Sequence, residues 1–204
     1  MIINLKNPTE LSSLYFVYHG STNLENEGQY GISHLMEHLE CKAFDDLQDE
    51  LQESKIVHNA YTSNNYIVFY FQGLEEYLSK FRDRIIDRIG TFNITEEDLE
   101  KEKKIVLEEY NDFFSDQYSV FLSNIYRRHY SSYLPIGKRD DIKNITYKDC
   151  LDYHTLQYKN PDMIISVSKD FNLELKDFNF SNRKGLMRNS WNYNQNIQLE
   201  NPIK

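Results

Sequence analysis

The chain has 204 residues, with 23 lysines and arginines against 32 aspartates and glutamates, and a formal net charge of −9 at pH 7. A chain of this length can bury a core of its own, and its acidic balance argues against nucleic-acid partners, because phosphate binding requires a basic face. The longest apolar run, Tyr66 to Phe71, is far shorter than the about 20 residues of a membrane-spanning helix, so no membrane partner is expected. Met1 to Lys6 lacks the features of a secretory signal, and two cysteines make no disulfide framework, which together favour a cytoplasmic location.

Hydrophobic alternation and turn residues predict that the N-terminal part of the chain consists of strands around a helical segment. We expect strands at 1–5 and 14–19, a polar loop with several glycines at 20–31, helices at 32–42 and 44–54, and strands at 56–62 and 66–72. Ser33 is a possible N-cap of the first helix. The residues between the last two strands, Ser63 to Asn65, are typical of a turn.

The C-terminal part of the chain is predominantly helical up to its last strand. Apolar residues at three- and four-residue spacing predict helices at 74–90, 95–114, 120–130 and 147–158, followed by a strand at 162–168. Thr95 and Thr146 are suitable N-caps, whereas the segment at 133–144 is expected to be a loop because it contains Pro135 and Gly137. Beyond residue 170 the apolar density falls, which divides the chain into a domain at 1–170 and a polar, asparagine-rich C-terminal arm at 171–204.

One cluster in the first predicted helix has the spacing of a metal site. His34 and His38 are four residues apart and share one helix face, where both imidazoles can bind a single zinc ion. Glu37 flanks the same face, close enough to reach a metal-bound water without being a ligand. The alternative is a pair of ordinary histidines on a polar helix, because short motifs also arise by chance.

A zinc site needs a third ligand, and the helix expected at 95–114 offers two carboxylates on an otherwise apolar stripe. The stripe consists of Leu99, Glu102, Val106, Glu109 and Phe113. A buried carboxylate is normally paired or metal-bound, although both would be solvated if this face were only half buried. Glu102 and Glu109 are about 10 Å apart along the helix axis, so only one of them can bind the same ion. Glu108 lies on the opposite side, where it can pair with Lys104.

Four blocks of sequence, taken in order, carry a resemblance to a known family. They are GSTNLENEGQYGISHLMEHLECKAF, HNAYTSNNYIVFYF, EKEKKIVLEEYND and PIGKRDDIKNITYKDCLDYHTLQYKNPDMIISVSKD. The first contains H-x-x-E-H, the inverzincin signature. The sequence between about residues 14 and 170 resembles the metal-carrying half-domain of the pitrilysin-type zinc peptidases, the group that includes insulin-degrading enzyme and the mitochondrial processing peptidase.

The resemblance implies a fold, a cofactor and a role for each motif residue. The implied fold class is α+β, with one mostly antiparallel sheet covered on one side by several helices. One zinc ion per chain would be bound by His34, His38 and Glu109. Glu37 would be the general base, and Glu102 an accessory carboxylate. Residues lining the substrate edge of the hairpin would be Asn59 and Ala60.

The function implied is that of a zinc-dependent endopeptidase, or the catalytic half of one. A peptide substrate would lie extended along the edge strand and pair with its backbone. Because the family's peptidases are built from two homologous halves, we expect this chain to form a homodimer or to pair with a separate homologous half-domain. Two alternatives remain: a non-catalytic half that serves as an interaction partner, and a structural zinc site with Cys41 as a fourth ligand.

Overall fold

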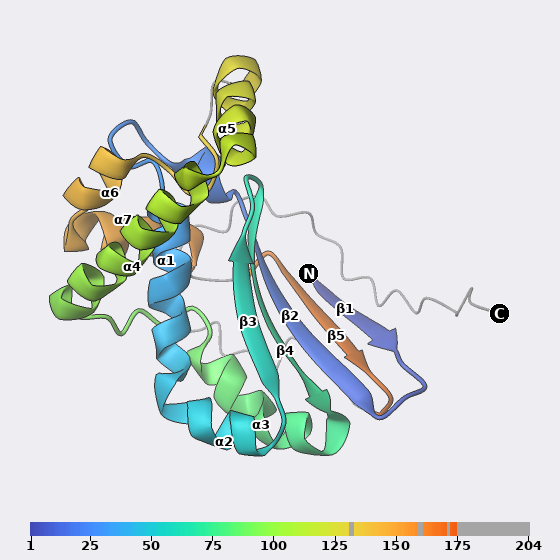
Figure 1. The fold of residues 1–204 in the computed structure, drawn as a ribbon. Coiled ribbons are helices and arrows are strands. Elements are labelled where there is room, and N and C mark those ends of the chain that lie inside the picture. Colours follow the sequence, from blue (N-terminus) through green and yellow to red (C-terminus); the bar gives the residue numbers. More distant parts are fainter. Residues whose placement is uncertain (131–132, 159–160, 171, 175–204) are drawn as a thin grey trace.

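The computed structural model describes residues 1–130, 133–158, 161–170 and 172–174, which include a five-stranded sheet (Figure 1). The strands are β1 (Ile2–Lys6), β2 (Leu11–His19), β3 (Val57–Thr62), β4 (Tyr66–Leu74) and β5 (Met163–Ser168), in the spatial order β1-β5-β2-β4-β3. β1 pairs with β5 in parallel, and the three other pairings are antiparallel. The prediction of a mostly antiparallel sheet is confirmed.

The helices of the described chain gather on one face of this sheet. They are α1 (Ile32–Cys41), α2 (Gln48–Glu53), α3 (Glu75–Arg88), α4 (Glu96–Ser115), α5 (Gln117–Tyr130), α6 (Arg139–Asn144) and α7 (Tyr147–Gln157), with 3-10 turns η1 (Ser21–Leu24) and η2 (Lys42–Leu47). α1 packs against β3, α4 and α7. In Figure 1, α5 extends away from the end of the sheet. Among the described helices, none is both long and apolar enough to cross a membrane.

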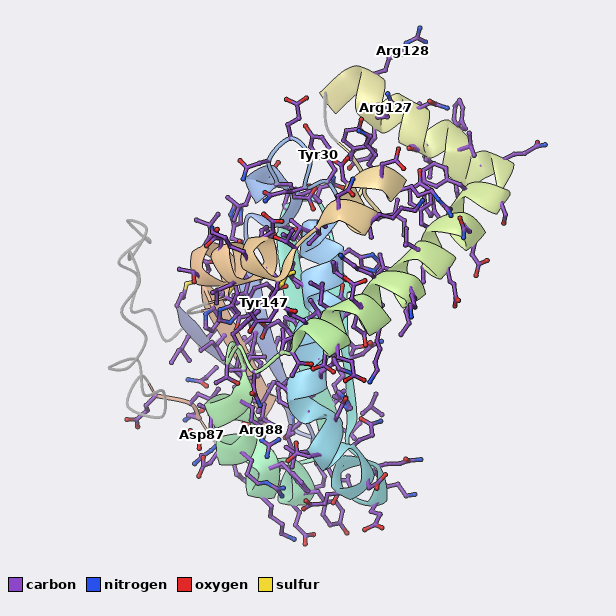
Figure 2. All side chains as sticks on the ribbon, turned by 90° about the vertical axis from the view of Figure 1, so that its left-hand side faces the viewer. Tyr30, Asp87, Arg88, Arg127, Arg128 and Tyr147 are labelled. Carbon is purple, nitrogen blue, oxygen red and sulfur yellow. The ribbon has the colours of Figure 1, made fainter. Side chains whose placement is uncertain are left out.

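Figure 2 looks onto the layer of helices and shows which helix lies at each end. Arg127 and Arg128 on α5 lie at the opposite end of this layer from Asp87 and Arg88 on α3. The guanidinium group of Arg127 lies 5.4 Å from the centre of the Tyr133 ring, and that ring packs at a tilt against Tyr30, with the ring centres 4.3 Å apart. These contacts link the end of α5 to the loop that precedes α1.

Alternation along β2 gives the sheet two different faces, because successive side chains in a strand point in opposite directions. Leu14, Phe16 and Tyr18 are completely buried on the helical side, whereas Tyr15 and Val17 on the other side are only partly buried. The buried side chains pack with a matching apolar stripe of α1, which consists of Ile32, Leu35, Met36 and Leu39. The core therefore lies between α1 and the sheet.

The second half of the predicted loop at 133–144 is a helix in the structure, so that prediction is wrong for α6. Asp140 and Asp141 lie in its first turn, where carboxylates interact favourably with the helix dipole, and Ile142 is completely buried. A helix of six residues is too short to show a periodic apolar pattern in the sequence.

Two glycines bring this segment against the start of α1. Gly31 and Gly137 both have positive φ angles, 104° and 72°, which residues with a side chain rarely adopt. A Cβ atom on Gly137 would lie 2.3 Å from the Cα of Gly31. The N–H of Lys138 also donates to the carbonyl of Tyr30 at 3.1 Å. The two loops are therefore packed backbone to backbone, which places the first turn of α1.

The N-terminus of α1 is capped differently from the sequence prediction. Its N-cap residue is Gly31, and Ser33 does not cap the helix. Instead, Oε1 of Glu25 accepts hydrogen bonds from the N–H groups of Gly31 and Ser33 and from the Ser33 hydroxyl. The carboxyl group of Glu25 thus supplies the acceptor that was expected from the Ser33 hydroxyl. The caps predicted at Thr95 and Thr146 are confirmed, both as capping boxes.

The segment at 44–54 also differs from the prediction. Residues 44–54 fold as the end of η2 followed by α2 and not as one continuous helix. Of the predicted C-terminal arm, residues 172–174 are described, and Leu173 is buried with its N–H and carbonyl bonded to the side chain of Asn4. The rest of the arm, at 171 and 175–204, lies outside the described residues.

Candidate metal centre

The candidate site lies between the outer face of α1 and the neighbouring helix α4. Because α1 buries its apolar stripe against the sheet, the residues on its other side face α4. His34 and His38 are on that side, and each side chain is 17% exposed. Glu109 faces them from α4 and is 45% exposed. The local periodicity of α1 thus presents both histidines to the same neighbour.

The structure brings the three predicted zinc ligands together. The Nε2 atoms of His34 and His38 are 3.3 Å apart, and Oε2 of Glu109 lies 3.4 Å from the first and 3.5 Å from the second. Ligands on a tetrahedral ion with bonds of about 2.0–2.1 Å are separated by roughly 3.3 Å. The three atoms therefore have the spacing that one zinc ion requires, and three protein ligands leave a fourth position for a substrate or water.

The protonation of His34 also suits a metal ligand. Burial, and to a lesser extent the neighbouring His38, lower the pKa of His34 to about 4. The imidazole is therefore neutral at neutral pH, which is the form that binds zinc.

Glu102 and Glu109 occupy different positions around His38. Oε2 of Glu102 lies 3.4 Å from Nδ1 of His38, on the side of the ring away from Glu109. Glu102 is buried, with a relative exposure of 8%. A carboxylate in this position can hold the Nδ1–H of a metal-binding histidine and leave Nε2 for the ion. The geometry thus favours Glu109 as the ligand and Glu102 as the accessory group.

Glu37 points toward β3 and is held by a residue that the sequence analysis missed. Its Oε2 accepts a hydrogen bond of 2.5 Å from the hydroxyl of Thr62. Burial raises the pKa of Glu37, and the Thr62 hydrogen bond and the charge of His38 oppose this effect. Thr62 is two residues beyond Ala60 on β3. Strand alternation from Ala60 could therefore have indicated that Thr62 lies on the same face of the strand.

An open cleft of about 450 Å³ surrounds these groups. It is lined by His34, Glu37, His38, Cys41, Lys42, Asp45, Asn59, Glu102 and Glu109. Asn59 lies on β3, the last strand at this edge of the described sheet, and its Oδ1 accepts a hydrogen bond of 2.9 Å from the N–H of Ala60. Asn59 therefore lies at both the cleft and the sheet edge, whereas Ala60 is 8% exposed and does not line the cleft.

Two other candidates from the sequence fit the centre less well. Glu108 is exposed and is absent from the described lining of the cleft. Cys41 does line the cleft, but burial raises the pKa of its thiol to about 12. Zinc binds the thiolate form, so burial disfavours Cys41 as a fourth ligand.

Comparison with known proteins places this fold and motif in a family. The sequence profile described as insulinase, peptidase family M16, matches residues 1–134. The chain belongs to peptidase family M16, and its α+β fold is that of one half-domain of this family.

The chain spans less than half the length of the curated relatives that follow. It is 28% identical over 198 residues to the zinc protease PqqE of Helicobacter pylori, which covers 90% of this chain and 45% of that protein. It is also 28% identical over 169 residues to mitochondrial-processing peptidase subunit beta of Bos taurus, which covers 76% of this chain and 34% of that protein.

Solved structures share the fold. A protease from Helicobacter pylori superimposes with a TM-score of 0.71 at 24% identity, over 85% of this chain and 44% of that one. A domain from Pseudomonas fluorescens described as a peptidase M16 inactive domain gives a TM-score of 0.70 at 12% identity, over 86% of this chain and 45% of that one. At these identities the likeness concerns the fold alone.

Proposed function

We propose that the chain is the catalytic half-domain of a zinc-dependent endopeptidase that hydrolyses extended peptides. The observation that carries the proposal is the convergence of His34, His38 and Glu109 at the edge lengths of a zinc tetrahedron, beside an open cleft. Three protein ligands with a free fourth position are typical of catalytic zinc sites, whereas structural sites have four.

The chain's own residues supply the proton transfers of hydrolysis. When bound, zinc polarises the scissile carbonyl and lowers the pKa of the attacking water. Glu37 can accept a proton from that water and pass it to the leaving amine, and burial, which raises the pKa of its carboxyl, makes it a stronger base. The hydrogen bond from Thr62 keeps the Glu37 carboxylate turned in one direction.

The edge of the sheet offers a place for the peptide. In the described sheet β3 pairs with β4 alone, so its outer edge can receive an extended chain by strand addition. Asn59 connects this edge to the cleft. A peptide bound along β3 would therefore pass the metal centre in an extended form, which favours short or unfolded substrates over folded proteins.

The sheet face opposite the helices favours a second half-domain as the partner. No described helix covers that face (Figure 1), and it carries partly buried or exposed apolar side chains. They include Tyr15, Val17, Tyr61, Tyr70 and Ile165. A large apolar surface of this kind usually marks an interface. We propose that a homologous half-domain, or a second copy of this chain, covers it.

A non-catalytic partner is the second candidate function. The observation in its favour is that a domain described as inactive has the same fold with a TM-score of 0.70. Against it, this chain has both histidines and the glutamate of H-x-x-E-H, together with Glu109 at the correct distance. We therefore favour the catalytic half.

The experiment combines zinc content, peptide hydrolysis and assembly state. We expect one zinc per chain and self-association or pairing in analytical ultracentrifugation. Hydrolysis of a quenched fluorescent peptide should require the metal. Glu37→Gln should retain the zinc and the fold but lower turnover about 100- to 10,000-fold. A zinc-loaded chain that cleaves nothing, alone or with a homologous half, would instead support the non-catalytic function.

A further inference from the structure

We propose that Lys42 is a positioning residue of the metal centre. Its ammonium group holds the Glu102 carboxylate in the orientation that fixes the His38 imidazole for metal binding. This inference rests on the zinc site proposed above and deepens it, because it assigns a role to a residue outside the H-x-x-E-H motif.

The contacts form a continuous chain from α4 to the end of α1. Lys42 directly follows the last residue of α1, and its Nζ lies 3.5 Å from Oε1 of Glu102. The other oxygen of that carboxylate, Oε2, lies 3.4 Å from Nδ1 of His38. The two oxygens of Glu102 are therefore divided between a cation and an imidazole.

This division constrains the rotation of the carboxylate. Glu102 has an 11% exposed side chain, so water does little to hold it in place. A carboxylate with a single partner can turn about its last side-chain bond, whereas a carboxylate held at both oxygens cannot. Groups that hold the second nitrogen of a metal-binding histidine set its tautomer and ring orientation. Lys42 thus acts on His38 through Glu102.

Two more carboxylates make the lysine necessary at this position. Nζ of Lys42 lies 3.5 Å from Oδ2 of Asp45 and 3.8 Å from Oδ1 of Asp98. Lys42 is the one lysine in the described lining of the cleft. Without its charge, Asp45 and Asp98 would no longer be offset and would repel Glu102, which would then move relative to His38.

A positioning role and a purely electrostatic role predict opposite changes in zinc affinity when this lysine is replaced. A positive charge close to a cation site weakens metal binding by Coulomb repulsion, so its removal alone should tighten zinc binding. If Lys42 holds Glu102 in place, its removal should weaken zinc binding. Replacement of residues that orient metal ligands typically costs about 10- to 100-fold in metal affinity.

The experiment measures the zinc dissociation constant of the full chain by competition with a chelator. Lys42→Met should raise this constant about tenfold, at the lower end of that range because the effect is indirect. Lys42→Gln provides a second uncharged variant, and Lys42→Arg, which keeps the charge, should restore most of the affinity. Lys101→Met is the matched control, since Lys101 pairs with Glu97 on the exposed side of α4.

A double variant tests whether Lys42 acts through Glu102. In the Glu102→Gln background, Lys42→Met should cause no further loss of zinc affinity. Ring nitrogen shifts of His38 in the metal-free chain should show the Nδ1–H tautomer in the unsubstituted protein and in Lys42→Arg, and a mixture of tautomers in Lys42→Met. Neither measurement depends on peptidase activity.

The outcomes separate this inference from the zinc site itself. Unchanged or tighter zinc binding in both uncharged variants would overturn the role of Lys42 while leaving the zinc site intact. Equal losses from Lys42→Met in the presence and absence of Glu102 would also overturn it. Failure of the unsubstituted chain to bind zinc would refute the proposed metal centre as a whole.

Discussion

Replacing Thr62 by valine removes one hydroxyl from the candidate site and leaves the shape of the side chain nearly unchanged. That hydroxyl donates the 2.5 Å hydrogen bond to Glu37, the proposed base. A hydrogen bond to a charged group contributes about 1.5–3 kcal/mol, and 1.4 kcal/mol corresponds to a factor of ten in rate. If the orientation of Glu37 matters fully in the transition state, kcat should fall roughly 10- to 100-fold in Thr62→Val.

The same substitution should change the pH dependence in a defined direction. Burial raises the pKa of Glu37, and the hydrogen bond from Thr62 lowers it. Removal of the hydroxyl leaves the effect of burial less opposed, so the pKa of Glu37 rises further. A base with a higher pKa is protonated over a wider range at low pH, and the acid limb of the rate profile should therefore move to higher pH.

The assay follows kcat and KM for a quenched fluorescent peptide, with zinc content measured on the same samples. Thr62→Ser is the matched control because it keeps the hydroxyl, and it should retain most of the activity. Zinc content should be equal in all three proteins, since Thr62 is not a ligand. The reasoning is refuted if Thr62→Val turns over at the unsubstituted rate, or if Thr62→Ser loses as much activity as Thr62→Val.

Three further predictions concern the ligand, the helix cap and the loop packing. Glu109→Gln should strip zinc at a chelator concentration that leaves Glu108→Gln loaded; the reverse result would assign the ligand to Glu108. Burial raises the pKa of Glu25 to about 7, so its carboxyl stabilises the fold while it is protonated and this stability is lost as the pH rises. Between pH 4.5 and 7 the free energy of unfolding should therefore fall by about 3 kcal/mol more in the unsubstituted chain than in Glu25→Gln, as measured by urea unfolding. Parallel pH profiles of the two proteins would contradict this. Gly137→Ala should destabilise the fold by about 2 kcal/mol or more, because its Cβ would clash with backbone. Gly28→Ala is the control, because Gly28 also has a positive φ but lies in open space, and it should cost less. Equal melting temperatures of the two variants would contradict the packing argument.

Local features were predictable from the sequence because they depend on residues close together in the chain. The pairing of His34 with His38 follows from helix periodicity, and the capping boxes at Thr95 and Thr146 span four residues each. The order of four sequence blocks predicted the α+β half-domain, which the fold and the family match confirm. α6 was not predicted, because a helix of six residues is too short to show a helical period of apolar residues.

Contacts between distant residues were decided by the tertiary structure. The sequence left two carboxylates on one stripe of α4, and only the packing of α4 on α1 placed Glu109 at Nε2 and Glu102 at Nδ1 of His38. Thr62 meets Glu37 across 25 positions of sequence, and no local pattern encodes that contact. Periodicity determines which face of an element carries a side chain, whereas the partner of that side chain depends on how the elements pack in three dimensions.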